Sequence, residues 1–467
     1  MSVISLHSNW FCRLVLASLL VSLVSELSFG QIFPGVGGLG RIGVVGGVSI
    51  DAQGVVRSAT AAQRSEMLSQ LRASAQQPSG DLAHVGQLRK VSLGRLQRAI
   101  AQKIADGQSL TDEMLYLAGL QRVQYVLVYP PEEGSNEVGD IVLAGPAEPW
   151  QVRDDASVVG QQSGRPVLRL EDLLVALRTS QAAQKDVISV SIDPTPAGEV
   201  RLRQLLAQAG ILSNGNPSVL EPAMKEALGP QVVTLSTVPK TSRMAQVLVW
   251  ADYQMKRLAM NLESSPVSGL PSYLEMIRDQ GNQGAQPRWW MASSYDALLH
   301  SEDSLAWHIT GQAVKALTED QFVTATGKRV GKGGAQRAAQ KWADLFTQKF
   351  DQLCASEAAF GEVRNMMDLN VVAALILSQE MQQRAGLDLS LLLVDAKGQL
   401  ATPEFHAPQS LEPQCSFVRG QAGWVVSASG GVEFNPWRIV SEAARQDDTV
   451  KAVHSKSISS NTHWWWN

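Results

Sequence analysis

Residues 357–383 read EAAFGEVRNMMDLNVVAALILSQEMQQ, and this stretch decides the fold. Its pattern is helical, and it is apolar enough for the helix to lie at the centre of a domain rather than on a surface. Another helix is predicted just before it, from Ala335 to about Cys354. The sequence therefore predicts a pair of consecutive helices, the second of which is central.

Strand-like segments and helices are mixed over the rest of the chain. The predicted strands are Val123–Tyr129, Asp140–Ala144, Trp150–Val152, Val187–Ile192, Val232–Leu235, Arg288–Met291, Leu305–Ile309, Ala313–Leu317, Leu391–Val394 and Trp424–Ser427. The other predicted helices are Ala61–Ala75, Leu93–Ile104, Leu170–Leu177, Ala197–Ala209 and a long helix from Met244 to Leu262. This mixture indicates an α+β fold with short, mostly antiparallel strands, and we expect two packed α+β regions, residues 81–215 and residues 216–440.

The segments outside these regions have a different character. Residues 31–80 begin as a glycine-rich leader, continue as a hairpin over Val44–Arg57 and end as a helix and a linker. The hairpin is predicted because the turn Asp-Ala-Gln-Gly separates two short apolar runs. Residues 441–467 lack apolar periodicity and end in three tryptophans, so we expect a disordered tail with an apolar tip.

The first thirty residues have the order of a secretory signal peptide. A polar lead and Arg13 precede an uncharged apolar run from Leu14 to Val24, which is too short for a membrane span of about 20 residues. Ser28 and Gly30 are small residues where signal peptidase requires them, so we expect cleavage before Gln31. An uncleaved anchor is the alternative. The sequence predicts an exported protein, periplasmic or extracellular.

Charge and hydropathy exclude some classes of partner. The formal net charge is -4, with 40 basic and 44 acidic residues, which argues against a nucleic-acid binder. After the signal peptide, the most apolar stretch, from Leu369 to Leu377, has only nine residues and contains Asn370, so we expect no transmembrane segment.

Two cysteines, Cys354 and Cys415, follow the signal peptide. In an oxidising compartment they can form a disulfide, which would stabilise the fold by roughly 4 kcal/mol for a loop of about 60 residues. Cys354 also lies in an apolar helical pattern, so a buried thiol is the alternative.

Motifs for known chemistry are missing from the sequence. It has no Gly-x-Ser-x-Gly nucleophile motif and no His-Glu-x-x-His zinc motif, and its histidines are not spaced as metal ligands. The sequence therefore predicts no cofactor and no metal site.

Three tryptophans and an arginine are the first candidate binding residues. Arg288, Trp289 and Trp290 are consecutive, and Trp307 follows in the next predicted strand. Exposed tryptophans stack on sugar rings or proline-rich peptides, and an arginine holds acidic groups. Neighbouring residues of a strand face opposite ways, so only one of Trp289 and Trp290 can line a given face, and packing in the core is the alternative for the other.

Charged residues inside the apolar helices are the second set of candidates. Asp252 with Lys256 and Arg257, and Arg364 with Asp368, have spacings that allow ion pairs along one helix. On a surface such pairs contribute little, whereas buried pairs must be neutralised and can mark a cleft.

Several segments resemble a known family. They are Leu117–Tyr125, Asp140–Glu148 with its string Ala-Gly-Pro-Ala-Glu, Gly164–Val167, Ala251–Arg257 and Pro287–Trp290. The chain resembles, from about Gly46 to Trp437, a family of exported proteins from planctomycete bacteria that is catalogued only as a domain of unknown function. The resemblance implies export and a bacterial envelope setting, and it implies no activity and no site residues.

Two functions fit these observations. The first is a non-enzymatic binding or structural protein of the bacterial cell envelope, whose partner is unknown and would be a cell-wall glycan or an envelope protein. The second is an envelope hydrolase that uses carboxylates such as Glu148 or Asp252 for acid and base chemistry. A closed pocket that joins these carboxylates would favour the hydrolase, and a flat aromatic face would favour binding.

Overall fold

A computed structural model gives the fold. It describes residues 48–50, 55–58, 68–69, 72, 75–134, 138–209, 217–277, 286–323, 329–331, 337–394, 398–418, 423–427, 430–442, 444–457 and 465–467. The predicted signal peptide, the glycine-rich leader and most of the predicted helix Ala61–Ala75 lie outside these residues.

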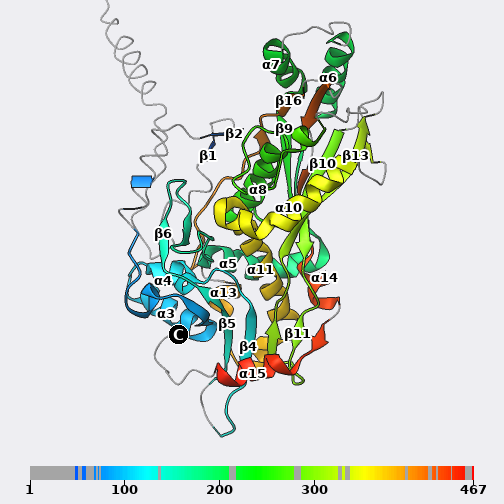
Figure 1. Ribbon diagram of the computed structural model, residues 1–467. Coiled ribbons are helices and arrows are strands. Elements are labelled where there is room, and N and C mark those ends of the chain that lie inside the picture. The colour runs from blue at the N-terminus through cyan, green and yellow to red at the C-terminus, as the bar shows by residue number, and fades with distance from the viewer. Residues whose placement is uncertain are drawn as a thin grey trace, which may run out of the picture. The chain divides into compact units, whose positions relative to one another are not determined.

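The described strands form two large sheets and two hairpins (Figure 1). The nine-stranded sheet contains, in spatial order, β1 (Val48–Ile50), β2 (Val55–Ser58), β15 (Ser410–Leu411), β9 (Gln231–Ser236), β8 (Ile188–Asp193), β18 (Gly430–Phe434), β10 (Gln286–Ser294), β13 (Ala313–Val323) and β14 (Arg329–Gly331). The six-stranded sheet contains β19 (Arg445–Gln446), β11 (Leu299–His300), β12 (Ala306–His308), β4 (Tyr125–Tyr129), β5 (Asp140–Ala147) and β3 (Gly86–Ser92). The hairpins are β6 (Trp150–Val152) with β7 (Val158–Gly160), and β16 (Gln414–Val418) with β17 (Gly423–Ser427).

Most strand pairs are antiparallel, and the described residues contain many helices, so the predicted α+β class is confirmed. The α-helices are α3 (Leu93–Ala105), α4 (Asp112–Leu115), α5 (Leu170–Lys185), α6 (Pro196–Ala209), α7 (Pro217–Leu228), α8 (Arg243–Ala259), α9 (Tyr273–Ile277), α10 (Arg337–Ser356), α11 (Ala358–Ser378), α12 (Met381–Ala385), α13 (Ser390–Leu393), α14 (Pro436–Ser441) and α15 (Asp448–Lys456). Short 3-10 turns cover Gly80–Ala83 and Leu117–Gly119. None of the helices within the described ranges is both long and apolar enough to cross a membrane.

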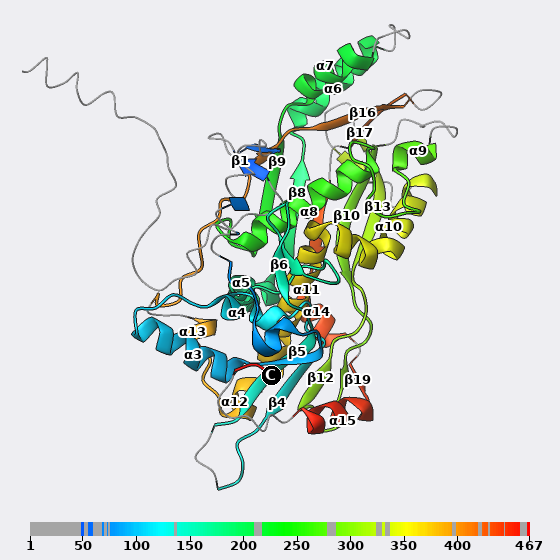
Figure 2. The ribbon, with the colours of Figure 1, turned by 60° about the vertical axis from the view of Figure 1, so that its left-hand side comes forward.

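The helix α11 lies at the centre, as the sequence predicts. Every residue from Ala358 to Ile376 is buried, and α11 packs against α5, α8, α10 and α14 (Figure 2). The helix ends earlier than predicted, at Ser378, because Glu380 adopts a left-handed backbone (φ 49°, ψ 39°) before α12 begins.

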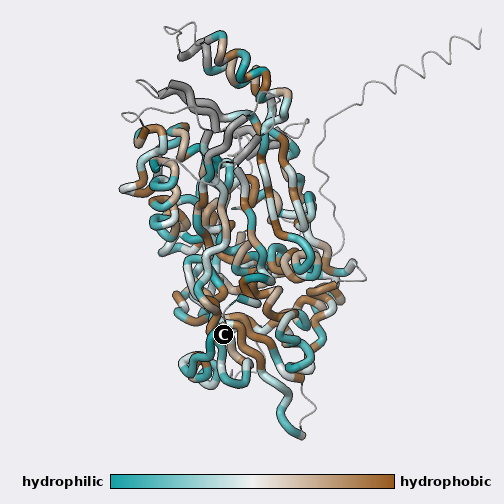
Figure 3. The backbone as a smooth tube through the Cα atoms, turned by 90° about the vertical axis from the view of Figure 1, so that its right-hand side faces the viewer, coloured by the Kyte–Doolittle hydropathy of each residue, from teal (hydrophilic) through white to brown (hydrophobic). Residues whose placement is uncertain are grey.

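Each large sheet takes strands from both of the sequence regions named above. The nine-stranded sheet joins β8 to β9, β10, β13 and β18, and the six-stranded sheet joins β3, β4 and β5 to β11 and β12. One continuous cluster of buried apolar side chains runs from Leu82 to Trp465. In Figure 3, hydrophobic residues gather in the strands beside the end marked C. The two regions therefore share one main core, and Leu127, Val142, Ala306 and Val450 form a small separate cluster.

Two local predictions differ from the structure. Residues 391–394 were expected to form a strand, but Ser390–Leu393 is the short helix α13, whose first turn starts where the Ser390 amide donates to the Asp388 carboxylate (2.9 Å). The tail was expected to be disordered from residue 441, but β19 and α15 lie within it. The Asp447 side chain caps α15, and Val450 is buried against the six-stranded sheet.

Gly430 permits the close approach of α8 to the nine-stranded sheet. A Cβ atom at this position would lie 2.4 Å from the Trp289 carbonyl oxygen, 2.6 Å from Lys256 Cε and 2.8 Å from Asp252 Oδ1. Real Cβ atoms do not approach other heavy atoms so closely. The glycine at the start of β18 is therefore a packing requirement of the helix that crosses beneath it.

We expect Gly430→Ala to destabilise the protein by about 2 kcal/mol, because the added methyl group must displace a strand or the buried side chains of α8. Urea unfolding followed by circular dichroism measures this change. The matched control is Gly86→Ala, whose Cβ would have its nearest neighbour at 3.6 Å. Equal stability of the two variants would contradict the packing role of Gly430.

Candidate functional site

A cleft lies on one face of the nine-stranded sheet, over β18, β10 and β13. Its volume is about 670 Å³, and we call it the sheet-face cleft. The side chains that matter most for its chemistry are those of Trp290, Tyr295, Lys315, Leu317, Glu433 and Arg438. Aromatic, acidic and basic groups thus line one cavity.

Strand register explains how these residues meet. Ala292 of β10 pairs with Lys315 of β13 on one side and with Glu433 of β18 on the other. Trp290, two residues earlier, therefore projects from the same face and pairs with Leu317. The small Ala292 side chain lies between a cation and an anion, with an aromatic ring beside them.

Trp290 is partly exposed, whereas its neighbour Trp289 is completely buried. Trp289 packs edge-on against Tyr273 and Trp342 on the opposite face of the sheet, with ring centroids 5.0 and 5.2 Å away. The Arg288 guanidinium lies 5.2 Å from the centre of the Trp290 ring, within the range of a cation–π contact. The predicted division of the two tryptophans between faces is therefore present.

Trp307 does not join this group. It lies in β12 of the other large sheet, is 3% exposed and stacks on His300 at 4.9 Å. Its indole nitrogen donates to the Ser304 carbonyl oxygen (3.1 Å). Of the four residues predicted to bind a ligand, Arg288 and Trp290 share a face of the sheet, while Trp289 and Trp307 are core residues of different sheets.

A short helix forms one wall of the cleft. The Asn435 side chain accepts a hydrogen bond from the Arg438 amide (3.0 Å) and so caps α14. Arg438 pairs with Glu442 (2.5 Å), and both side chains are exposed. Sequence reasoning missed this wall, although Asn-Pro followed by an apolar stretch is a recognisable start signal of a helix.

Tyr295 connects the cleft to a buried ion pair. Its hydroxyl donates to Asp368 Oδ1 (2.8 Å), and Arg122 donates to both oxygens of the same carboxylate (2.8 and 3.0 Å). Burial, and next the Asp368 charge, raise the pKa of Tyr295 well above its ordinary value. The phenol thus stays protonated and acts as a hydrogen-bond donor, not as a base.

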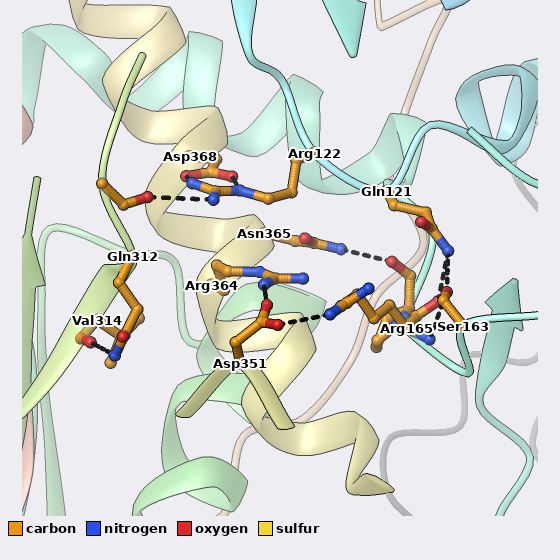
Figure 4. A network of polar contacts seen from close by, with 12 residues as sticks. Gln121, Arg122, Ser163, Arg165, Gln312, Val314, Asp351, Arg364, Asn365 and Asp368 are labelled. Carbon is orange, nitrogen blue, oxygen red and sulfur yellow. Dashed lines mark hydrogen bonds and ion pairs between the residues drawn. The ribbon is translucent and has the colours of Figure 1, made fainter. Parts of the chain in front are cut away.

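Arg364 and Asp368 do not pair with each other, which corrects the predicted helical pair (Figure 4). Arg364 donates to Asp351 of α10 (3.0 Å), and Arg165 also contacts that carboxylate (2.6 Å). Asp368 is fully occupied by Arg122 and Tyr295. Each of these two charges on α11 therefore has its partner outside the helix, because α11 is enclosed by other parts of the chain.

Asp252 and Lys256 form an ion pair of 2.7 Å along α8, and both side chains are almost inaccessible to solvent. Of the two alternatives, a surface pair and a buried pair, the structure has the buried pair, because this face of α8 packs under β18. Burial raises the pKa of Asp252, while Lys256 and the Gly431 amide oppose that rise. Arg257 does not share this pair, because it contacts Glu263 (3.1 Å).

Arg243 holds a carboxylate cluster that sequence reasoning did not find. It contacts Asp172 (2.6 Å), Glu362 and Glu171 (3.6 Å), and Arg169 also contacts Glu171 (3.4 Å). Two guanidiniums thus face three carboxylates. Burial raises the pKa of Asp172 to about 7, against the opposing charge of Arg243. The signal missed in the sequence is the pair Glu171-Asp172 at the start of an apolar helix.

Glu148 has a structural role. Its Oε2 accepts hydrogen bonds from the Gln162 and Ser163 amides, both 2.9 Å long. A Cβ at Gly160 would lie 2.4 Å from this oxygen, so the carboxylate is enclosed by the loop that it holds. Neither Glu148 nor Asp252 lines the sheet-face cleft.

Cys354 is a free thiol at the core, and burial raises its pKa to about 11. The structure therefore has the buried thiol of the two alternatives, not the disulfide with Cys415. Cys354 lies on the buried face of α10, where no water reaches the sulfur. The side chain of Cys415 lies outside the described residues.

Within the described residues, no group of three or more histidine, cysteine, aspartate or glutamate side chains has the arrangement of a metal site.

Comparison with known proteins gives one match. Residues 190–273 match the family described as "Protein of unknown function (DUF1598)". The matched segment begins within β8, contains α6, α7, β9 and α8, and ends at the first residue of α9. It includes the Asp252–Lys256 pair and none of the residues that line the sheet-face cleft. No curated protein and no solved structure matches the chain.

The Arg243 cluster predicts a pH-dependent stability. In the unfolded chain Asp172 ionises near pH 4, whereas the folded protein retains its proton up to about pH 7. Its contribution to stability is therefore complete below pH 4 and is lost as the pH rises through 7. Between pH 5 and pH 7 this loss should amount to about 2 kcal/mol.

We expect Asp172→Asn to flatten this part of the pH profile, since an amide has no proton to release. Urea unfolding at pH 5, 6, 7 and 8 measures the slope. Glu357, whose pKa burial raises to about 7, gives the comparison variant Glu357→Gln, which should remove a separate share of the slope. An unchanged slope in Asp172→Asn would show that Asp172 is ionised throughout this range.

Proposed function

We propose that the chain is a non-enzymatic binding protein of the bacterial cell envelope and that it holds a sugar-containing polymer in the sheet-face cleft. The observation that carries this proposal is the partly exposed Trp290 ring in a cavity lined by charged and polar side chains. Aromatic rings stack on the apolar faces of sugars, and polar side chains around them bind the hydroxyl groups.

The polar groups of the cleft favour a glycan over a proline-rich peptide. Ser293, Ser294 and Asn435 also line the cleft, and they offer hydroxyl and amide groups that match sugar hydroxyls. A proline-rich peptide docks in a groove lined by several exposed aromatic side chains. Here Trp290 is accompanied by Tyr295, whose hydroxyl is directed to Asp368, and by Phe434, which is buried.

Charge narrows the class of glycan further. Lys315 and Arg438 face Asp296, Glu433 and Glu442 around the same cavity. A ligand that carries both amino and carboxyl groups would pair with both signs, whereas a strongly anionic polymer would be repelled by three carboxylates. The proposed ligand is therefore a cell-wall glycan with amino and acidic substituents.

The two carboxylates that the sequence offered to a hydrolase, Glu148 and Asp252, are engaged outside the cleft. Glu148 holds a loop through two amides, and Asp252 neutralises Lys256 beneath β18. Tyr295, which lines the cleft, donates its hydroxyl hydrogen to Asp368. This geometry supports binding through the cleft more than acid and base chemistry.

Export is part of the same proposal. It rests on the order of charge, apolar run and small residues in residues 1–30, and on the resemblance to exported planctomycete proteins. A periplasmic or extracellular location would bring the sheet-face cleft to the polymer that we propose as its ligand.

We expect Trp290→Ala to weaken binding of soluble cell-wall glycan fragments at least tenfold, because the stacking platform is lost. Isothermal titration calorimetry with the purified chain measures the affinity. Trp290→Phe should retain most of the binding, and Val394→Ala, at a surface residue that is 68% exposed and does not line the cleft, should change nothing.

Two results would overturn the glycan proposal. One is an unchanged affinity in Trp290→Ala when circular dichroism shows an intact fold. The other is binding of proline-rich peptides in the absence of any binding to glycan fragments.

We also expect the protein from its native cells to begin at Gln31 and to fractionate with the envelope. Mass spectrometry of the N-terminal peptide after cell fractionation gives both results. An intact Met1 in a cytoplasmic fraction would contradict export, and it would leave the binding measurement on the purified chain unaffected.

A further inference from the structure

The segment Trp465–Asn467 forms an additional short strand at the edge of the six-stranded sheet. Its backbone pairs with β3, on the side of β3 that does not face β5. The Lys90 amide donates to the Asn467 carbonyl oxygen (2.9 Å), the Asn467 amide donates to the Lys90 carbonyl oxygen (3.0 Å), and the Ser92 amide donates to the Trp465 carbonyl oxygen (2.8 Å). Figures 1 and 2 both place this end of the chain beside the sheet.

Two tryptophans anchor this strand. Trp465 is 5% exposed and belongs to the main apolar core. The Trp466 ring lies 5.7 Å from the Arg89 guanidinium. Arg89 is itself fixed by the carbonyl oxygens of Ala118 (2.9 Å), Asp81 (2.9 Å) and His84 (3.0 Å). The edge of β3 thus binds an extended segment by backbone hydrogen bonds, with the Trp465 indole buried in the core and the Trp466 indole beside Arg89.

The segment is joined to the rest of the fold by a short stretch of chain. Helix α15 ends at Lys456, and the seven residues 458–464 lie outside the described residues. Such a stretch spans at most about 25 Å when extended. The Ser457 carbonyl oxygen accepts a hydrogen bond from Lys90 Nζ (3.5 Å), so the stretch starts near the edge that the segment occupies.

We propose that the edge of β3 is a strand-acceptor site for a second copy of this chain, which inserts its own Trp465–Asn467 segment there. A second copy is the natural partner, because it offers to β3 the same backbone groups and the same two indoles as the chain's own segment. Exchange of an identical element needs no new interface, only that the connecting residues lead to another molecule. Addition of an extended segment to a sheet edge is an established mode of protein recognition.

The balance between the two arrangements depends on concentration. A short connection gives the segment an effective concentration in the millimolar range at its own β3. The closed monomer therefore dominates in dilute solution. Exchange between copies becomes competitive when copies are crowded, or when they refold together at high concentration.

Paired cysteines test this proposal. Lys90 and Asn467 exchange both of their backbone hydrogen bonds, and residues paired in this way have Cα atoms about 5.5 Å apart, which suits a disulfide. Lys90→Cys and Asn467→Cys are placed in separate chains with tags of different mass, both in a Cys415→Ser background. The two chains are refolded together at high concentration and oxidised, and non-reducing electrophoresis with mass spectrometry detects the product.

We expect a disulfide-linked heterodimer from this mixture, in at least fivefold higher yield than from the same chains refolded separately at low concentration and then mixed. Adding Trp465→Ala to the Asn467→Cys chain should abolish the heterodimer, because the anchor in the core is lost. A single chain that carries both cysteines is the control for geometry and should oxidise within one molecule.

If the single chain oxidises and the mixture gives no heterodimer, exchange between copies is excluded. Should either cysteine variant fail to fold, the unmodified chain gives an independent result. Its molar mass by light scattering after refolding at high concentration should show dimers, and Trp465→Phe, which retains an aromatic anchor, should show them too. Monomers alone would also overturn the proposal. These outcomes do not depend on glycan binding.

Discussion

The structure depends on the neutralisation of charges inside a helix that is buried on every side. α11 carries Glu362, Arg364 and Asp368, and water cannot stabilise any of them. An unpaired ion at such a depth costs several kcal/mol, so each needs a partner in a fixed position. The partners are Arg243 of α8, Asp351 of α10, and Arg122 from the chain before β4. The ion pairs thus fix how three other parts of the chain dock on α11.

The same requirement connects the core to the sheet-face cleft. Asp368 accepts from Tyr295, which lines the cleft, and from Arg122, which also donates to the Gly311 carbonyl oxygen (3.2 Å) just before β13. The Asp252–Lys256 pair lies under β18 at the point where Gly430 has no side chain. The strands that carry Trp290, Lys315 and Glu433 are therefore supported from beneath by buried charges. A cleft whose strands are fixed in this way can bind a ligand with little rearrangement.

Sequence reasoning predicted the elements better than their partners. Periodicity predicted α8, α10 and α11, because a helix shows its buried face in the order of its own residues, and short apolar or aromatic runs predicted β4, β8 and β10. The partner of Arg364 was predicted wrongly because the spacing to Asp368 is local, whereas Asp351 comes near only when α10 folds back on α11. Sequence reasoning grouped Trp307 with Trp289 as binding residues, whereas the strand order places them in two different sheets. Arg243 and its carboxylates come from α5, α8 and α11, so no single stretch of sequence could reveal them.

The position of β18 has a consequence for the order of folding. This strand lies between β8 and β10, pairs antiparallel with one and parallel with the other, and comes from residues 430–434. The middle of the nine-stranded sheet therefore cannot close until residues 430–434 have left the ribosome. Contacts between residues so distant along the chain slow folding. Until β18 is made, β8 and β10 each lack a partner on the edge that β18 later occupies. A chaperone or a translocation channel would therefore meet a chain whose central sheet is incomplete.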